Sequence, residues 1–223
     1  MESEQTLLRR DIQCWTARLS DLSWFMRCLN EWLARAANEE DGCTGRFWEG
    51  RFKSQALLDE VALLTAMAYV DLNPVRVGVA VAVPDSDFTS VQQRLFEVAR
   101  AVDTSSTPNE NVLPSLVPFV GAERTDGRTD LPFNLQDYLD LVDSSGRVVR
   151  ADKRGAISVD TPRLLHVLGI APDEWLRTVT QMQSRFELFI GAPHRLRHIA
   201  EQRGWRWVCG LSAARRLYVR VNR

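Results

Sequence analysis

The stretch DEVALLTAMAYVDLNPVRVG, residues 59–78, carries the strongest structural signal in the chain. Its apolar side chains recur at three- and four-residue steps, which is the period of an α-helix with a buried face. Asp59 stands immediately before this run and can cap its first turn. Pro74 disfavours helical geometry at the preceding residue, so the helix should end close to Tyr69. The stretch therefore predicts a largely buried helix with a tyrosine near its C-terminal end.

Upstream of this helix, the sequence predicts another helix and then a strand. The helix starts near Ser20 or Asp21, either of which can cap it, and the polar segment NEEDGCTG, residues 38–45, ends it. In RFWEGRFKSQA, residues 46–56, apolar and charged side chains alternate, and this period of two predicts a strand. One face of the upstream helix is apolar, and its positions are Leu22, Phe25, Met26, Leu29 and Leu33.

Downstream, residues 103–130 are rich in Thr, Ser, Pro, Asn and acidic side chains, which is typical of a linker. Four helical segments follow it, within residues 135–143, 161–169, 171–191 and 192–204. The predicted fold class is α+β. The predicted domains are residues 1–100, a linker of residues 101–130, and a mainly α-helical C-terminal domain of residues 131–223.

The composition of the 223 residues is that of an ordinary globular protein, with 28 Lys and Arg against 29 Asp and Glu. No apolar run approaches the roughly 20 residues that cross a bilayer, so we expect a cytoplasmic protein without a membrane partner. The charge is unevenly distributed, because residues 185–223 hold nine arginines and two glutamates. We expect this basic end to interact with a polyanion.

Aromatic residues are interleaved with the C-terminal arginines, namely Trp205, Trp207 and Tyr218. Such a mixture suits the pairing of arginine with phosphate and the stacking of unpaired bases on rings. The alternative is a solvated helical face above two core tryptophans. The DNA-contact candidates in this region are Arg206, Arg215 and Arg216.

Tyr69 and Asn73 are four residues apart, so a phenol and an amide oxygen can lie on one helical face. A phenol is a weak nucleophile at neutral pH and needs a cation to stabilise its phenolate. Positive charge could come from Arg76, Arg51 or Lys53. The alternative is a core tyrosine whose hydroxyl has an ordinary hydrogen-bond partner.

His194 and His198 form a second chemical candidate, because their spacing places both rings on one helix face. The sequence offers no nearby third ligand, and the adjacent arginines disfavour a metal ion. His166 is expected at the surface or end of a helix.

The run GRFWEGRFKSQALLDEVALLTAMAYVDLNPVRVGVA, residues 45–80, closely resembles the end of the catalytic domain of single-tyrosine HUH transposases, especially the REP-associated tyrosine transposase group. The resemblance combines F-W-E-G-R-F-K-S with Y-V-D-L-N-P-V-R and a following V-G. It extends over residues 19–80 most convincingly, and the basic C-terminal region resembles the helical extension of longer members.

This resemblance implies a ferredoxin-like catalytic domain that acts on single-stranded or hairpin DNA. Tyr69 would attack a phosphodiester, forming a 5′-phosphotyrosine and releasing a 3′-OH. Asn73 would help to hold Mg²⁺ or Mn²⁺. Beyond what the resemblance implies, Arg51, Lys53 and Arg76 are our own candidates for contacts with DNA. Copies of the chain could associate as a homo-oligomer, and a bacterial, nucleoid-associated location would follow from DNA binding.

The chain departs from the family at its metal site. The family holds its metal chiefly through a His-hydrophobic-His strand upstream of the first helix, whereas this chain has no histidine before His166. We therefore expect the C-terminal part of a transposase, with an incomplete ferredoxin-like domain and no cleavage activity. The alternatives are a non-catalytic DNA-binding remnant and a helical interaction protein.

Overall fold

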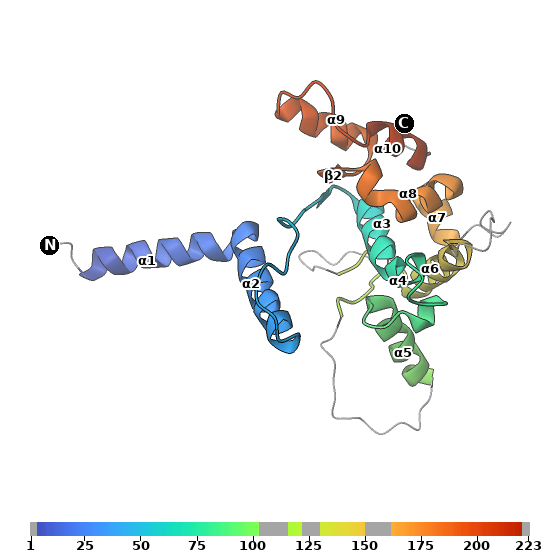
Figure 1. Cartoon of the computed structure of the whole chain (residues 1–223). Coiled ribbons are helices and arrows are strands. Elements are labelled where there is room, and N and C mark those ends of the chain that lie inside the picture. Colours follow the sequence, from blue (N-terminus) through green and yellow to red (C-terminus); the bar gives the residue numbers. More distant parts are fainter. Residues whose placement is uncertain (1–3, 103–115, 122–129, 150–161, 220–223) are drawn as a thin grey trace. The chain divides into compact units, whose positions relative to one another are not determined.

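The computed structural model describes residues 4–102, 116–121, 130–149 and 162–219. The chain divides between Ser54 and Gln55 into two units, called unit 1 and unit 2 below (Figure 1). The sequence instead predicts boundaries near residues 100 and 130. Most of that predicted linker lies outside the described residues.

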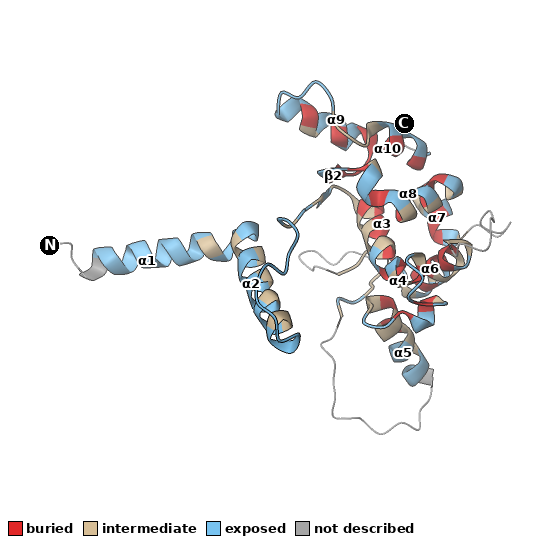
Figure 2. Cartoon of the chain, in the orientation of Figure 1, coloured by how far each residue is buried: buried red, intermediate tan, exposed pale blue. Residues whose placement is uncertain are grey.

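Unit 1 consists of α1 (Glu4–Leu19), α2 (Leu22–Glu40) and a segment without regular structure. The predicted cap of α2 is confirmed, because the Asp21 carboxylate accepts hydrogen bonds from the backbone N–H groups of Ser23 and Trp24. None of the residues whose burial is described in this unit is buried (Figure 2).

The strand predicted over residues 46–56 is wrong for nearly its whole length. Residues 46–55 contain no strand, and β1 spans only Ala56–Leu57. The indole N–H of Trp48 donates instead to the carbonyl of Asn30 on α2, at 2.9 Å. Alternating side chains alone do not make a strand, because its backbone groups also need a neighbouring strand to pair with.

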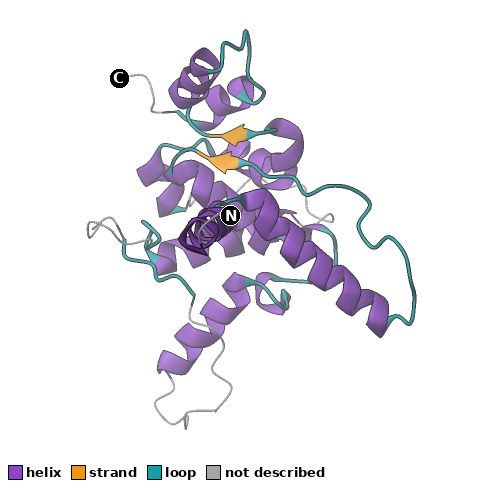
Figure 3. Cartoon of the chain, turned by 90° about the vertical axis from the view of Figure 1, so that its left-hand side faces the viewer, coloured by secondary structure: helices purple, strands orange, loops and turns teal. Residues whose placement is uncertain are grey.

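The sheet belongs to unit 2 and has two short parallel strands, β1 and β2 (Phe189–Ile190). Ala56 is opposite Phe189, and Leu57 is opposite Ile190. Figure 3 shows the two strands side by side. The sequence pattern predicts that residues 186–191 form the end of a helix, and this prediction is also wrong. The helix before them, α8 (Pro172–Arg185), ends at an extended Phe186.

The predicted central helix is confirmed as α3 (Glu60–Asp71), with Asp59 as its N-cap. Pro74 does not prevent a further helical turn, since it lies in the first turn of α4 (Asn73–Arg76). Val70 is exposed, so α3 is buried on fewer sides than its composition indicates. One face of α3 packs against α8. The core around this contact includes residues from Val61 to Tyr218.

The other elements of unit 2 surround this pair of helices. They are the 3₁₀ turn η1 (Val83–Asp85), α5 (Ser90–Val102), α6 (Leu135–Val149), α7 (Arg163–Leu168), α9 (Pro193–Gln202) and α10 (Leu211–Leu217). The four predicted C-terminal helices correspond to α6, α7, α8 and α9, while the sequence does not predict α1, α4, α5 or α10. At the class level the fold is mainly helical with a small strand pair.

Asp59 forms hydrogen bonds with residues near both ends of unit 2. One of its carboxylate oxygens accepts from the N–H of Ala62 at 2.9 Å and from the hydroxyl of Tyr218 at 2.7 Å. The other accepts from the N–H of Ala192, 2.7 Å away. A Cβ at Gly191 would lie 2.7 Å from the Cβ of Leu58, so only glycine permits this close approach of β2 to the start of α3.

Candidate nucleic-acid interface

Tyr69 lies near the end of α3, partly buried against the core of unit 2. The guanidinium carbon of Arg76 lies 4.1 Å from the centre of the tyrosine ring, a cation–π contact. Arg76 also donates to the side-chain oxygen of Asn73 and, at 3.0 Å, to the backbone carbonyl of Thr180 on α8. Tyr69, Asn73 and Arg76 therefore come together as predicted, and we call them the tyrosine cluster.

The tyrosine cluster does not fit the metal site that the resemblance implies. The oxygen of Asn73 already accepts a hydrogen bond from the cationic Arg76, which is an unfavourable neighbour for a divalent cation. The described residues contain no group of three His, Cys, Asp or Glu side chains placed to hold a metal ion. Asn73 is thus unsuited to the expected role of metal ligand.

Asp71, two residues after Tyr69, has a structural role that was missed in the sequence. Its buried carboxylate accepts from the hydroxyl of Tyr138 at 2.5 Å, from Ser90 Oγ at 2.9 Å and from the N–H of Val91 at 3.3 Å. Burial and then the charge of Asp71 raise the pKa of Tyr138. The contacts join α3 to the start of α5 and to α6, so the Asp in Y-V-D-L-N-P stabilises the core here.

Two of the predicted DNA contacts, Arg51 and Lys53, belong to unit 1 and are exposed in the segment before β1. Arg51 lines a shallow hollow that also includes Trp24, Arg27 and Phe52. Within unit 1 this hollow offers two guanidinium groups beside two rings, which is compatible with the predicted backbone contacts.

The two adjacent arginines of α10 differ in their surroundings. Both are exposed, but Arg216 forms an ion pair with Glu174 at 3.4 Å and donates to Ser212 Oγ at 2.8 Å. Burial opposes ionisation of Glu174, but Arg185 and Arg216 outweigh it and lower the pKa of this carboxyl. Arg216 is therefore partly neutralised, and Arg215 is the better candidate for a phosphate contact.

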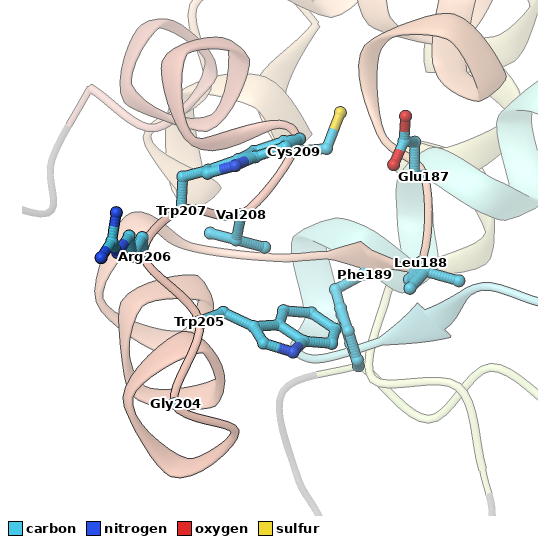
Figure 4. A pocket seen from close by; sticks show the side chains of 9 residues that line it. All are labelled: Glu187, Leu188, Phe189, Gly204, Trp205, Arg206, Trp207, Val208 and Cys209. Carbon is cyan, nitrogen blue, oxygen red and sulfur yellow. The ribbon is translucent and has the colours of Figure 1, made fainter.

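The loop between α9 and α10 presents the remaining candidate, Arg206, between two exposed tryptophans. Trp205 is 38% exposed and Trp207 is 74% exposed. Together with Glu187–Phe189 and Val208–Cys209, these residues line a cavity of about 500 Å³. We call this cavity the aromatic pocket; Figure 4 shows Trp207 and Trp205 on opposite sides of Val208.

Another arginine, Arg203, lies against two of the aromatic rings that line the pocket. The guanidinium of Arg203 is 5.2 Å from the ring centres of both Phe189 and Trp205. These two rings are 6.1 Å apart and tilted by 57°. An arginine held against two rings loses little freedom when it binds a phosphate.

A glycine fixes the end of this loop. Gly210 has φ +88°, and a Cβ there would lie 2.3 Å from a ring atom of the buried Phe186. Phe186 in turn immediately precedes Glu187 and the strand β2. Both walls of the aromatic pocket are therefore anchored at one point of the core.

Tyr218 was predicted as a third stacking ring, and this expectation is wrong. Its ring is buried and its hydroxyl donates to Asp59. Burial and then Asp59 raise the pKa of Tyr218.

The structure groups neither His194 and His198 nor His166 with enough further ligands among the described residues to hold a metal ion. His194 and His198 are exposed on α9, and His198 Nε2 lies 2.9 Å from the side-chain nitrogen of Gln202. His166 is exposed on α7, as expected.

Comparison of the chain with protein-family models, with curated proteins and with solved structures finds no match. Across the described residues, every helix is too short or too polar to cross a lipid bilayer.

Proposed function

We propose that this protein binds single-stranded DNA through the aromatic pocket and the arginines around it, and that it is related to the single-tyrosine HUH transposases. The observation that carries the proposal is the pairing of two exposed tryptophans with Arg203 and Arg206 in one short loop of unit 2. Isolated exposed rings are common on proteins, but two beside a cavity and two guanidinium groups form a surface suited to bases and phosphates.

The energetics of such a surface favour single strands over duplexes. Stacking of a base on an aromatic side chain contributes about 1–3 kcal/mol, and only an unpaired base exposes its face for it. Each arginine that contacts a phosphate releases counterions, so affinity decreases as salt increases. With about three phosphate contacts, the affinity should fall roughly 20-fold between about 50 and 200 mM salt.

The tyrosine cluster supports the proposed ancestry but not present cleavage. Its phenol, amide and guanidinium match the motif of the family, and α2, residues 45–58 and α3 would derive from the ferredoxin-like catalytic domain. The oxygen of Asn73 is already bonded to Arg76, and the described surroundings of Tyr69 supply no set of metal ligands. We therefore propose a DNA-binding protein that does not cleave, with a cytoplasmic location at the nucleoid.

The test is a comparison of binding and covalent capture on the same DNA. A fluorescently labelled single strand, its hairpin form and its full duplex are titrated with the whole chain, with and without a chelator. We expect tighter binding to the single strand, a marked salt dependence and no response to chelator. Equal affinity for the single strand and the duplex would overturn the proposal that the aromatic pocket binds single-stranded DNA.

Cleavage is checked in the same samples with Mn²⁺ on a denaturing gel. We expect no covalent protein–DNA band with the unmodified chain. A band that disappears in Tyr69→Phe would show that Tyr69 is a live nucleophile and would refute the non-cleaving part of the proposal.

A further inference from the structure

Glu187 is the one acidic residue among those that line the aromatic pocket, and the proposed function does not use it. It is exposed and lies two residues before the start of β2, on the wall that also carries Leu188 and Phe189. Its carboxylate forms no ion pair or hydrogen bond with any residue that the structure describes. Figure 4 shows Glu187 and Arg206 at opposite ends of the pocket.

A carboxylate in this position selects for particular chemistry. It only accepts hydrogen bonds and it repels phosphate, so a ligand that reaches it must bring N–H or O–H donors. The tryptophans and Phe189 favour a flat ring in the same space. A nucleobase meets both requirements when its sugar and phosphate point toward Arg206 and its hydrogen-bonding edge points toward Glu187.

The four bases differ in what they offer to a carboxylate. The Watson–Crick edge of guanine carries two adjacent donors, N1–H and N2–H, which can reach both oxygens at once. Adenine and cytosine present one amino group beside an acceptor nitrogen, and thymine presents one N–H between two carbonyl oxygens. Two parallel hydrogen bonds to an ionised group are both stronger and more selective than one.

We infer that the aromatic pocket binds an unpaired guanine, stacked on its tryptophans and held at its Watson–Crick edge by Glu187. This inference rests on the proposed function, since it names the base that the single-stranded DNA site prefers. Arg203 and Arg206 bind the backbone without regard to sequence, and Glu187 supplies the selectivity.

The experiment compares two single strands that differ at one position. The first is a 12-residue oligothymidine, and the second has a single guanine at its centre. Each is titrated against the whole chain by fluorescence anisotropy. A bidentate contact to a base edge typically discriminates by about 1–3 kcal/mol, so we expect the guanine strand to bind between about fivefold and 150-fold more tightly.

Glu187→Gln is the informative variant and Glu201→Gln is its matched control. Both remove one negative charge from an exposed residue in the basic region, but Glu201 lies on α9 and does not line the pocket. Both should strengthen binding of oligothymidine slightly and equally. Only Glu187→Gln should reduce the guanine preference, to less than about threefold, because an amide offers one acceptor oxygen.

The results separate this inference from the proposed function. Equal binding of the two strands by the unmodified chain, or an unchanged preference in Glu187→Gln, would overturn the guanine site while leaving single-strand binding intact. If neither strand binds, or if the binding does not weaken as salt increases, the proposed function and the inference are overturned together.

Discussion

The two units of this chain contain similar helices but differ in what those helices bury. α2 in unit 1 and α3 in unit 2 both have a capping aspartate and a set of apolar side chains. In unit 2, α3 places Leu64 and Ala68 in a core that reaches from Val61 to Tyr218. In unit 1, none of the residues whose burial is described is buried (Figure 2).

This difference shows that an apolar stripe predicts a helix without showing what covers it. Fully burying a large apolar side chain contributes about 1.5–3 kcal/mol, and helices gain most of their stability from such packing. The apolar side chains of unit 1 obtain little of this contribution within the described structure. The free energy of folding should therefore reside almost entirely in unit 2.

The largest expected effect comes from one substitution made in both units. Trp175 on α8 is fully buried and its indole N–H donates to Ser145 Oγ at 3.0 Å, so Trp175→Ala should reduce the free energy of unfolding by about 3–5 kcal/mol. Trp32 on α2 is 67% exposed, and Trp32→Ala should change it by less than about 0.5 kcal/mol. Urea titrations followed by circular dichroism measure both. Similar losses would mean that unit 1 has a core of its own.

Raising the pH above about 10 should lower the free energy of unfolding of unit 2, because two of its tyrosines are buried. Burial and a neighbouring aspartate raise the pKa of Tyr138 and of Tyr218 above their unfolded value near 10. Their stabilising contribution is therefore complete below pH 10 and is lost as the pH rises further. Each should lower the free energy of unfolding by about 1.4 kcal/mol per pH unit above that value.

Tyr138→Phe provides the control for this pH dependence. It should halve the slope above pH 10 and, because it removes the hydrogen bond to Asp71, lower the neutral stability by about 1.5–3 kcal/mol. An unchanged slope in this variant would show that Tyr138 ionises as readily in the folded state as in the unfolded state.

A third substitution contrasts exposed tryptophans of the two units. Trp207→Ala should weaken binding of single-stranded DNA by about 1–3 kcal/mol, because it removes a stacking surface. It should hardly alter stability, since the side chain is 74% exposed. Trp32→Ala, with a similar exposure, should leave the affinity unchanged. Loss of affinity in both variants would place part of the DNA site in unit 1.

A smaller effect should distinguish the adjacent arginines of α10. Arg215→Gln removes an exposed charge and should lower DNA affinity about two- to threefold and reduce the salt slope by about 0.7. Arg216→Gln should lower it less, because Glu174 already neutralises part of that charge. A larger effect of Arg216→Gln, measured by anisotropy at several salt concentrations, would contradict this order.

The smallest effect is expected at Tyr69. Its ring packs under the Arg76 guanidinium and against the core, so Tyr69→Phe keeps the contacts of the ring and should leave DNA affinity within experimental error. A tenfold loss would mean that the phenol hydroxyl contacts DNA and that the tyrosine cluster is part of the binding surface.

The sequence was informative wherever the signal is local. The aspartate caps of α2 and α3 and the contact between Tyr69, Asn73 and Arg76 depend on residues within about seven positions of one another. Trp205 and Trp207 were recognised as stacking candidates beside arginines for the same reason. The base-stacking role, the guanine preference and the transposase ancestry remain predictions.

The sequence was misleading wherever the local structure depends on a partner that is distant in the sequence. The alternation in RFWEGRFKSQA satisfies the rule for a strand, but no strand among the described residues pairs with residues 46–55, and the pairing falls on Ala56 and Leu57, which lie opposite β2. Val117, within the predicted linker, likewise has a distant partner, since its carbonyl accepts from Arg94 at 2.9 Å.

By itself, the sequence determined six of the described helices (α2, α3 and α6–α9), the aspartate caps of α2 and α3 and the basic character of the C-terminal region, since these follow from spacing and composition along the chain. Only the tertiary structure decided that α3 shares a core with α8, that Tyr218 is buried on Asp59 while Trp207 is exposed, and that Glu187 lines the same pocket as Trp205. Burial and proximity are set by contacts between segments far apart in the sequence, and no local pattern specifies them.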